Sequence, residues 1–143
     1  MDFVKLVIPG CPKGKERPRW SKKSQRMYTP AATSDYEDFI KLVYRQNYGA
    51  NMFPKGVPLD LRIRAYCPVP KSDSMKVRAK KLSGEIRPTV KPDWDNIGKI
   101  VADSLNKIAY YDDAQIVDSQ TRKFYSDRPR VEILIQIAGG QQK

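Results

Sequence analysis

The chain has 143 residues, the length of one domain, and its 40% hydrophobic and 30% charged residues are typical of a globular protein. It contains no histidine, which excludes catalytic triads, histidine acid–base catalysis and histidine metal sites. Its two cysteines, Cys11 and Cys67, are too few for a disulfide framework or a tetrahedral zinc site. The 27 Lys and Arg residues against 16 Asp and Glu residues give a net charge of +11, which favours a polyanionic partner, nucleic acid before an anionic membrane surface.

The N-terminal part of the chain is predicted to form a short strand followed by a basic loop. Apolar residues on both faces indicate a strand at Phe3–Pro9, and the Gly and Pro content of residues 10–26 indicates a loop. One acid, Glu16, stands in this loop among seven basic residues: Lys13, Lys15, Arg17, Arg19, Lys22, Lys23 and Arg26. The loop is therefore the first candidate for contacts with phosphate groups.

A helix and a second strand are expected next. Thr33 or Ser34 is placed to cap a helix that runs to about residue 48, because apolar residues recur there with a 3.6-residue period. These residues are Tyr36, Phe39, Ile40, Val43 and Tyr44. Residues 49–58 are predicted to be a connector, and residues 59–67 alternate apolar and polar side chains, which predicts a half-buried strand.

The following region has a less regular pattern and then a strongly periodic one. Residues 72–82 are predicted to form a short basic helix, and the Gly and Pro residues in 83–92 predict a mobile loop. Residues 95–108 combine a capping residue, a 3.6-residue apolar period and no internal proline, which predicts a helix.

Two strands are predicted to end the fold, at residues 117–125 and 130–137, with a turn at 126–129 between them. Residues 139–143 are expected to be a frayed tail. The order of elements predicts one α+β domain over residues 1–143, in which a small mixed β-sheet of about four strands packs with two main helices.

Acidic and basic side chains share one face of the helix that begins within the sequence KPDWDNIGKIVADSL. Asp95 is placed as the N-cap, and Asp95, Lys99 and Asp103 follow one another at i, i+4 and i+8. The opposite face is an apolar stripe of Ile97, Ile100, Val101, Leu105 and Ile108. Asp93 can point toward the same place as Asp95 if the chain bends at Trp94.

A second acidic pair, Asp112 and Asp113, comes just before the 117–125 strand. If the loop 109–111 returns the chain beside the start of the helix, three or four carboxylates converge at the edge of the sheet. Such a cluster needs a cation to offset the repulsion between its charges. A site made only of oxygen ligands suits Mg²⁺ or Mn²⁺.

Each of these acids also has a structural interpretation. Asp95 can be a helix cap only, Lys99 and Asp103 can form an exposed ion pair worth about 0.3–0.5 kcal/mol, and the second acidic pair can be a turn. Asp103 is the member that we expect in a structural or supporting role. Tyr110 and Tyr111 are expected to pack rather than stack on bases. No single structural explanation covers both acidic pairs and the lysine, which favours a functional site.

The block KPDWDNIGKIVADSL followed by YYDDAQIV resembles the signature of the RusA-type Holliday junction resolvases, metal-dependent endonucleases common in prophages. The basic loop with RPR and YTP between the first strand and the first helix is similar to many members of that family. The resemblance implies that Asp93, Asp95 and Asp113 bind metal and act in catalysis and that Lys99 is the catalytic lysine, and it leaves the role of the neighbouring Asp112 open.

The resemblance also implies the partners and the reaction. A family member is expected to be a homodimer that needs Mg²⁺, with Mn²⁺ as a substitute, and no small organic cofactor. Its expected reaction is the resolution of four-way DNA junctions by paired symmetric nicks, in recombination and repair inside a bacterial or phage-infected cell.

Basic side chains are the predicted contacts to DNA phosphates, and exposed aromatic ones are the predicted contacts to bases. The segment before the first aspartate, RPTVKP, carries only Arg87 and Lys91, so we expect the N-terminal loop to supply the positive charge. Trp20 and Trp94 are the candidates for stacking, and Trp94 lies between two proposed ligands. The predicted DNA contacts are Lys13, Lys15, Arg17, Arg19, Lys22, Lys23, Lys91, Trp94 and Lys123, with residues 71–87, Arg128 and Arg130 as further candidates.

Three alternatives stay open. The same site can belong to a nuclease that cuts flaps or other branched DNA more broadly, or the acids can be scaffolding in a non-catalytic basic DNA-binding module. A membrane-surface protein is the third alternative. No apolar run approaches the roughly 20 residues of a membrane span, and the N-terminus lacks the layout of a signal peptide, so we expect a soluble, cytoplasmic protein.

Overall fold

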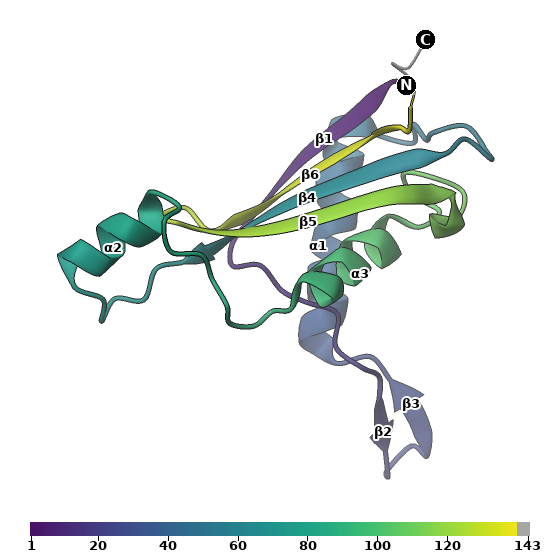
Figure 1. The fold of residues 1–143 in the computed structure, drawn as a ribbon. Helices are drawn as coiled ribbons and strands as arrows, with labels where there is room; N and C mark the ends of the chain where they lie inside the picture. Colours follow the sequence, from purple (N-terminus) through teal and green to yellow (C-terminus); the bar gives the residue numbers. More distant parts are fainter. Residues whose placement is uncertain (140–143) are drawn as a thin grey trace.

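The structure of the protein, a computed structural model, describes residues 1–139, so the predicted frayed tail lies outside the described residues apart from Gly139. A four-stranded sheet, three α-helices and a separate two-stranded hairpin make up this part of the chain (Figure 1). The elements in chain order are β1 (Phe3–Pro9), β2 (Arg19–Ser21), β3 (Arg26–Tyr28), α1 (Ala31–Tyr48), β4 (Leu59–Pro68), α2 (Met75–Leu82), α3 (Trp94–Leu105), the 3₁₀ turn η1 (Asp113–Gln115), β5 (Ile116–Ser126) and β6 (Arg130–Ile137).

The main sheet is mixed, with the strand order β1-β6-β4-β5. β4 and β5 run parallel, whereas β6 is antiparallel to both β1 and β4. A parallel pair needs a crossover connection, and the chain between β4 and β5 supplies it with α2 and α3. The predicted α+β fold with about four strands and two main helices is confirmed.

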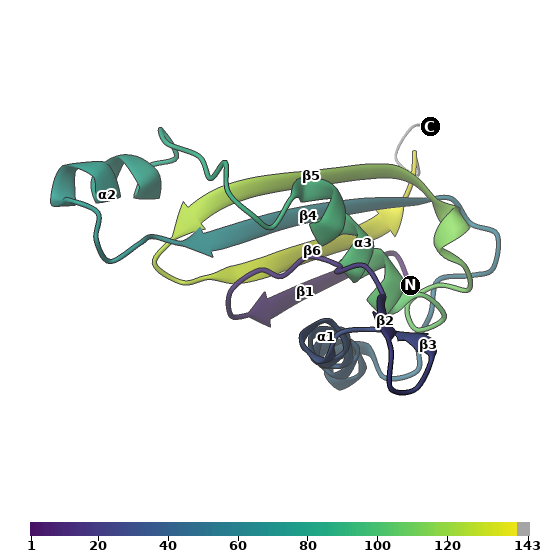
Figure 2. The same ribbon diagram turned by 90° about the horizontal axis from the view of Figure 1, so that it is seen from below.

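The helices α1 and α3 lie on one face of the main sheet, and α2 lies beyond its end (Figures 1 and 2). Alternate side chains of the strands point to α1 and α3, as Val4, Leu6 and Ile8 of β1 do. The apolar faces of the two helices complete the core. The opposite face of the sheet carries none of the helices in residues 1–139 (Figure 2). None of these helices is long and apolar enough to cross a membrane.

The basic segment 10–26 is not a loop throughout, contrary to the prediction. Its strand β2 pairs antiparallel with β3, and the hairpin projects away from the body of the molecule (Figure 1). The side chains of both strands are largely exposed, so the sequence has no apolar alternation that would indicate a strand here.

The helix α1 begins at Ala31, and the prediction that Thr33 or Ser34 caps it is wrong. Pro30 occupies the N-cap position with φ at −53°, and the N–H of Ser34 donates to its carbonyl at 3.1 Å. Thr33 is instead buried, and its hydroxyl donates to the carboxylate of Glu16 at 3.4 Å. Thr33 thus joins α1 to the N-terminal segment.

The helix α3 begins one residue before the predicted start and ends at Leu105 rather than Ile108. Asp93 holds the N-cap position without a capping hydrogen bond from its side chain, and Asp95 lies in the first turn. The prediction of Asp95 as the N-cap is therefore wrong. The chain cannot continue as an α-helix at Lys107, because its φ is 63°, whereas residues of an α-helix have φ of about −63°.

The basic helix predicted at residues 72–82 is present as α2. Residues 83–92 form neither helix nor strand, as expected, but two contacts join them to β5. The Arg87 Nε atom donates to the Lys123 carbonyl at 2.6 Å, and the Lys123 ammonium donates to the Val90 carbonyl. The mobility of this segment stays a prediction.

Candidate active site

The start of α3 carries two exposed carboxylates that face a basic cleft. Asp93 and Asp95 line this cleft of about 640 Å³ together with Arg17, Arg19 and Lys91. Neither carboxylate forms an ion pair among residues 1–139, and Asp95 accepts a hydrogen bond at 3.0 Å from the N–H of the next residue. Both carboxylates are therefore available to a cation.

The wall of the cleft opposite α3 is the N-terminal segment, which is held tightly against the helix. The N–H of Lys15 donates to the carbonyl of Asn96 at 2.8 Å. A Cβ atom at Gly14 would lie 2.9 Å from the Cβ of Asn96 and 3.1 Å from the Cβ of Pro92. Only glycine permits this approach without a shift of backbone, so Gly14 sets the width of the cleft at its floor.

Lys15 lies at the inner end of this segment and is engaged by two carboxylates. Its ammonium is 2.8 Å from the carboxylate of Glu37 in α1 and 3.4 Å from that of Asp103 in α3. Burial alone would lower the pKa of Lys15, but the hydrogen bond and the charge of Glu37, followed by those of Asp103, raise it. The structure therefore presents Lys15, a predicted DNA contact, as a link between two helices.

The carboxylate of Asp112 caps the turn η1 at the other end of α3. It accepts a hydrogen bond at 2.9 Å from the N–H of Ala114, and the Gln115 side chain accepts at 3.1 Å from the N–H of Asp112. The side-chain NH₂ group of Gln115 donates to the carbonyls of Pro54 and Val57, each at 3.0 Å. The Asp and Gln of the DDAQ sequence thus form a capping box that is anchored to the 54–57 connector.

Asp113 lies beside Asp112 and Asp103. Its N–H donates to the side chain of Asn106, the residue after α3, at 3.1 Å. Burial, the hydrogen bond and charge of Asp112, and the charge of Asp103 all raise the pKa of Asp113. The hydrogen bonds from the Ala114 N–H and from Asp113 lower the pKa of Asp112. The negative charges at this end of the helix therefore repel one another.

The two acidic pairs lie at opposite ends of α3. Asp93 and Asn106 are thirteen positions apart in the sequence, a separation of about 20 Å at the helical rise of 1.5 Å per residue. Within residues 1–139, no group of three or more Asp, Glu or Cys side chains is close enough to hold a metal ion. The expectation that the second pair returns to the start of the helix is therefore wrong for a single chain.

The physical reason lies in the turn that follows α3. Tyr110 is buried, and its hydroxyl donates to the carbonyl of Ala102 at 2.6 Å. The N–H of Lys107 donates to the carbonyl of Tyr110 at 2.8 Å. These bonds hold the chain at the end of the helix. Tyr110 packs in the core as predicted, whereas Tyr111 is 47% exposed, so the packing role predicted for it is wrong.

Lys99 is exposed one helical turn after Asp95. The structural alternative, an ion pair between Lys99 and Asp103, is not formed, because Asp103 pairs with Lys15. Among the residues that the structure describes, Lys99 has no ion-pair partner. Its ammonium is therefore available to an anion that binds beside Asp95.

Except for Lys123, the other predicted DNA contacts lie between the cleft and the hairpin. Lys13 and Arg17 lie on the docked N-terminal segment, and Trp94, 66% exposed, begins α3. Arg19 lies in β2, Lys22 and Lys23 lie in the turn of the hairpin, and Lys91 lines the cleft. Lys123 lies apart in β5, where its ammonium donates a hydrogen bond to the carbonyl of Val90.

The sequence reasoning missed two features of this region. Asn96 supplies the carbonyl that fixes the N-terminal segment, and its place in the DWDN block is the signal that could have drawn attention to it. Met27 lies directly across the hairpin from Trp20. The pairing of two exposed apolar side chains in an otherwise basic segment could have indicated a hairpin.

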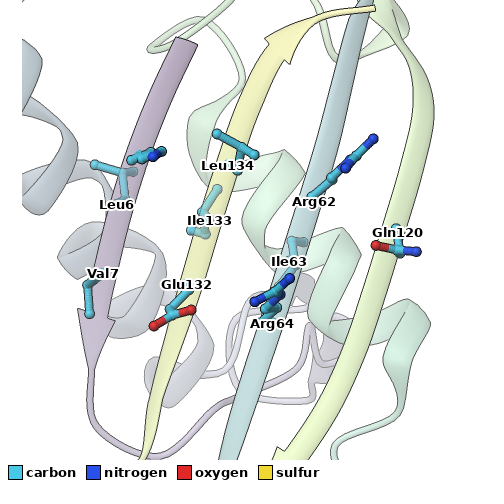
Figure 3. Close-up of a pocket in the computed structure, with 10 residues that line it drawn as sticks. Leu6, Val7, Arg62, Ile63, Arg64, Gln120, Glu132, Ile133 and Leu134 are labelled. Carbon is cyan, nitrogen blue, oxygen red and sulfur yellow. The ribbon is translucent and has the colours of Figure 1, made fainter.

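A separate depression of about 430 Å³ lies on the helix-free face of the main sheet (Figure 3). Side chains of four strands line it, among them Arg62, Arg64 and Glu132. Its one acid, Glu132, is already paired with Arg130 at 3.0 Å. The depression therefore offers no carboxylate pair to a metal, and the candidate site is the cleft at the start of α3.

Comparison with known proteins identifies the family. The family model described as Endodeoxyribonuclease RusA matches residues 9–136. The chain is 38% identical over 140 residues to the uncharacterized protein YqaN of Bacillus subtilis, which covers 95% of this chain and 97% of that protein. It is 30% identical over 111 residues to the crossover junction endodeoxyribonuclease rusA of Lactococcus phage r1t, which covers 77% of this chain and 76% of the phage protein. The chain therefore belongs to the RusA endodeoxyribonuclease family.

Proposed function

We propose that the protein is a metal-dependent endonuclease that resolves four-way DNA junctions by paired symmetric nicks, in recombination and repair in a bacterial or phage-infected cell. The observation that carries this proposal is the cleft at the start of α3, where Asp93 and Asp95 have no ion-pair partner among residues 1–139. Family membership and the name of the phage relative support the same reaction.

The donor set of the cleft fits a hard divalent cation. Asp93 and Asp95 offer carboxylate oxygens only, which suits Mg²⁺ and also Mn²⁺. A bound ion of this kind supplies Lewis-acid activation of water and neutralises charge on a phosphate. The surrounding Arg17, Arg19 and Lys91 attract the DNA backbone to the two carboxylates, whose own charge would otherwise repel it.

Lys99 acts next to the scissile phosphate in this proposal. Its ammonium lies one turn along α3 from Asp95 and is free of ion pairs among the described residues. There it donates hydrogen bonds to the phosphate oxygens as negative charge builds on them. The N-terminus of α3 adds a favourable dipole for a phosphate held at the same place.

The third carboxylate, Asp113, is proposed to come from a second copy of the chain. Asp113 lies near the end of α3, about 20 Å from the first pair. A two-fold axis that sets two α3 helices antiparallel places the end of each one beside the start of the other. A homodimer of this kind holds two complete and identical sites, which is what paired symmetric cleavage requires.

Cleavage of a synthetic immobile four-way junction in Mg²⁺ tests the proposal. We expect paired, symmetric nicks in the junction in the presence of linear duplex and single-stranded competitors. Asp95→Asn should bind the junction as the wild type does and cut it at least about a hundredfold more slowly, because a neutral amide is a poor ligand for Mg²⁺. Undiminished cutting by Asp95→Asn would reject the carboxylate assignment.

A broader nuclease of flaps and other branched DNA is the second candidate, and one observation favours it. Residues 87–92, just before Asp93, include only two basic residues, and one of them, Arg87, already donates to the Lys123 carbonyl. Metal-dependent cutting of every branched substrate at similar rates would select this candidate. Tight binding without cutting would instead make the protein a non-catalytic DNA-binding module.

A further inference from the structure

The β2–β3 hairpin exposes an apolar patch that the core does not use. Trp20 and Met27 lie directly opposite each other on the two strands, so their side chains share one face. Trp20 is 57% exposed and Met27 is 56% exposed. The hairpin projects from the body of the molecule, with no part of the main sheet behind it (Figure 1).

The hairpin that carries this patch is also strongly basic. Residues 17–34 contain no acid, and Arg19, Lys22, Lys23 and Arg26 lie on the hairpin itself. None of these side chains forms an ion pair among residues 1–139. Because successive side chains of a strand alternate, Arg19 and Arg26 project from the face opposite Trp20 and Met27. A hairpin with an apolar pair on one face and cationic side chains on the other face and in the turn complements bases held between phosphates, and it repels a second copy that presents the same charge.

The root of the hairpin also lies at the candidate site. Arg17 and Arg19 at its root line the same cleft as Asp93 and Asp95. The close approach of Gly14 to α3 holds this root against the helix. DNA whose phosphate lies in the cleft must therefore pass beside the hairpin.

We infer that the β2–β3 hairpin is a wedge that inserts Trp20 and Met27 at the branch point of DNA. In continuous duplex each base pair is covered by its neighbours, whereas a branch point exposes base faces at the ends of its arms. An indole ring stacks on such a face, and a methionine side chain fills the adjoining step. This inference rests on the proposed function, because it identifies the part of the protein that recognises the substrate as branched.

Fluorescence of 2-aminopurine tests the wedge without cleavage. The base analogue is placed at the branch point of a four-way junction or ten base pairs along one arm, and the protein is added in EDTA. The wild type should lower the fluorescence at the branch point only, because an indole ring that stacks on 2-aminopurine quenches its emission. The double variant Trp20→Ala, Met27→Ala should lose this signal, and its preference for junction over linear duplex should fall about tenfold or more.

Two further variants serve as controls. Leu42→Ala removes an apolar side chain of α1 that is 51% exposed, and it should leave the signal and the preference unchanged. Trp20→Phe keeps a flat ring and should retain most of both. Circular dichroism of each variant should match the wild type, since the substituted side chains lie outside the core.

Several results would overturn the inference. One is that the wild type binds the junction without changing the 2-aminopurine fluorescence at the branch point. Another is that the double variant keeps the full fluorescence change. Loss of self-association by the double variant in sedimentation velocity would make the patch an interface between copies instead. The fluorescence assay contains no Mg²⁺, so it does not depend on cleavage. If the protein binds the junction but cuts no DNA in Mg²⁺, the proposed function is rejected and the wedge is not. If the protein does not bind the junction, the proposed function and the wedge are both rejected.

Discussion

Lys15 and Lys22 are both lysines of the basic N-terminal segment, but the structure gives them different roles. The Lys15 side chain is 19% exposed and bridges Glu37 and Asp103, whereas Lys22 lies in the exposed turn of the hairpin without an ion pair among residues 1–139. Spacing along the sequence does not distinguish them, because the partners of Lys15 come from α1 and α3. A lysine with internal partners contributes to stability, and a free one contributes to binding of phosphate.

This difference predicts opposite effects of two matched substitutions. Lys15→Met should lower the free energy of unfolding by about 1–3 kcal/mol, because it leaves two partly buried carboxylates without their cation. Lys22→Met should change it by less than about 0.5 kcal/mol. In DNA binding the order reverses, and Lys22→Met should reduce the salt dependence of affinity by about one phosphate contact. Urea unfolding and binding titrations at several salt concentrations measure both; equal destabilisation by the two variants would contradict the assignment.

At the scale of elements, the site depends on how the N-terminal segment docks on α3. Gly14→Ala should lower the free energy of unfolding by about 1–3 kcal/mol, since its Cβ atom would lie 2.9 Å from that of Asn96. It should also weaken junction cleavage, because the segment carries one wall of the cleft. Gly98→Ala within α3 is the control: its Cβ atom would meet Thr121 at 3.4 Å, and alanine favours helix by about 0.5–1 kcal/mol. Urea unfolding measures both variants. Equal stability of Gly14→Ala and Gly98→Ala would contradict the docking of the N-terminal segment on α3.

The elements that the sequence predicts well are those whose apolar period reports burial. The strands β1, β4 and β6 alternate inward and outward side chains, and α3 has an apolar stripe that faces the core. The β2–β3 hairpin has no buried face, so it lacks the apolar alternation that reports burial, and Trp20 and Met27 are its one signal. The path after α3 could not be predicted either, because it depends on the bond of Tyr110 to Ala102, a contact between residues with no motif of their own.

At the scale of the whole molecule, the described part of one chain does not bring the three predicted metal ligands together. The metal-binding roles of Asp93, Asp95 and Asp113 stay a prediction from the sequence, and their grouping depends on where the crossover between β4 and β5 begins and ends. That crossover runs along α3 and leaves the first pair at one end and Asp113 at the other. Asp93, Asp95 and Asp113 can therefore bind one metal ion together only if two chains combine. The sequence pattern of a single chain does not contain this information about assembly.

Subunit mixing tests this assembly directly. Asp95→Asn and Asp113→Asn should each be inactive alone, whereas a purified heterodimer of the two should nick the junction. In a shared site, the heterodimer concentrates both substitutions in one site and leaves the other site with an intact Asp95 and an intact Asp113. It should therefore make single nicks, at about half the wild-type number of cuts, and not paired ones. If each chain instead built its own site, every site in the heterodimer would carry one substitution, and the heterodimer would be as inactive as its parents. A monomer in sedimentation equilibrium with full activity would reject the dimer itself.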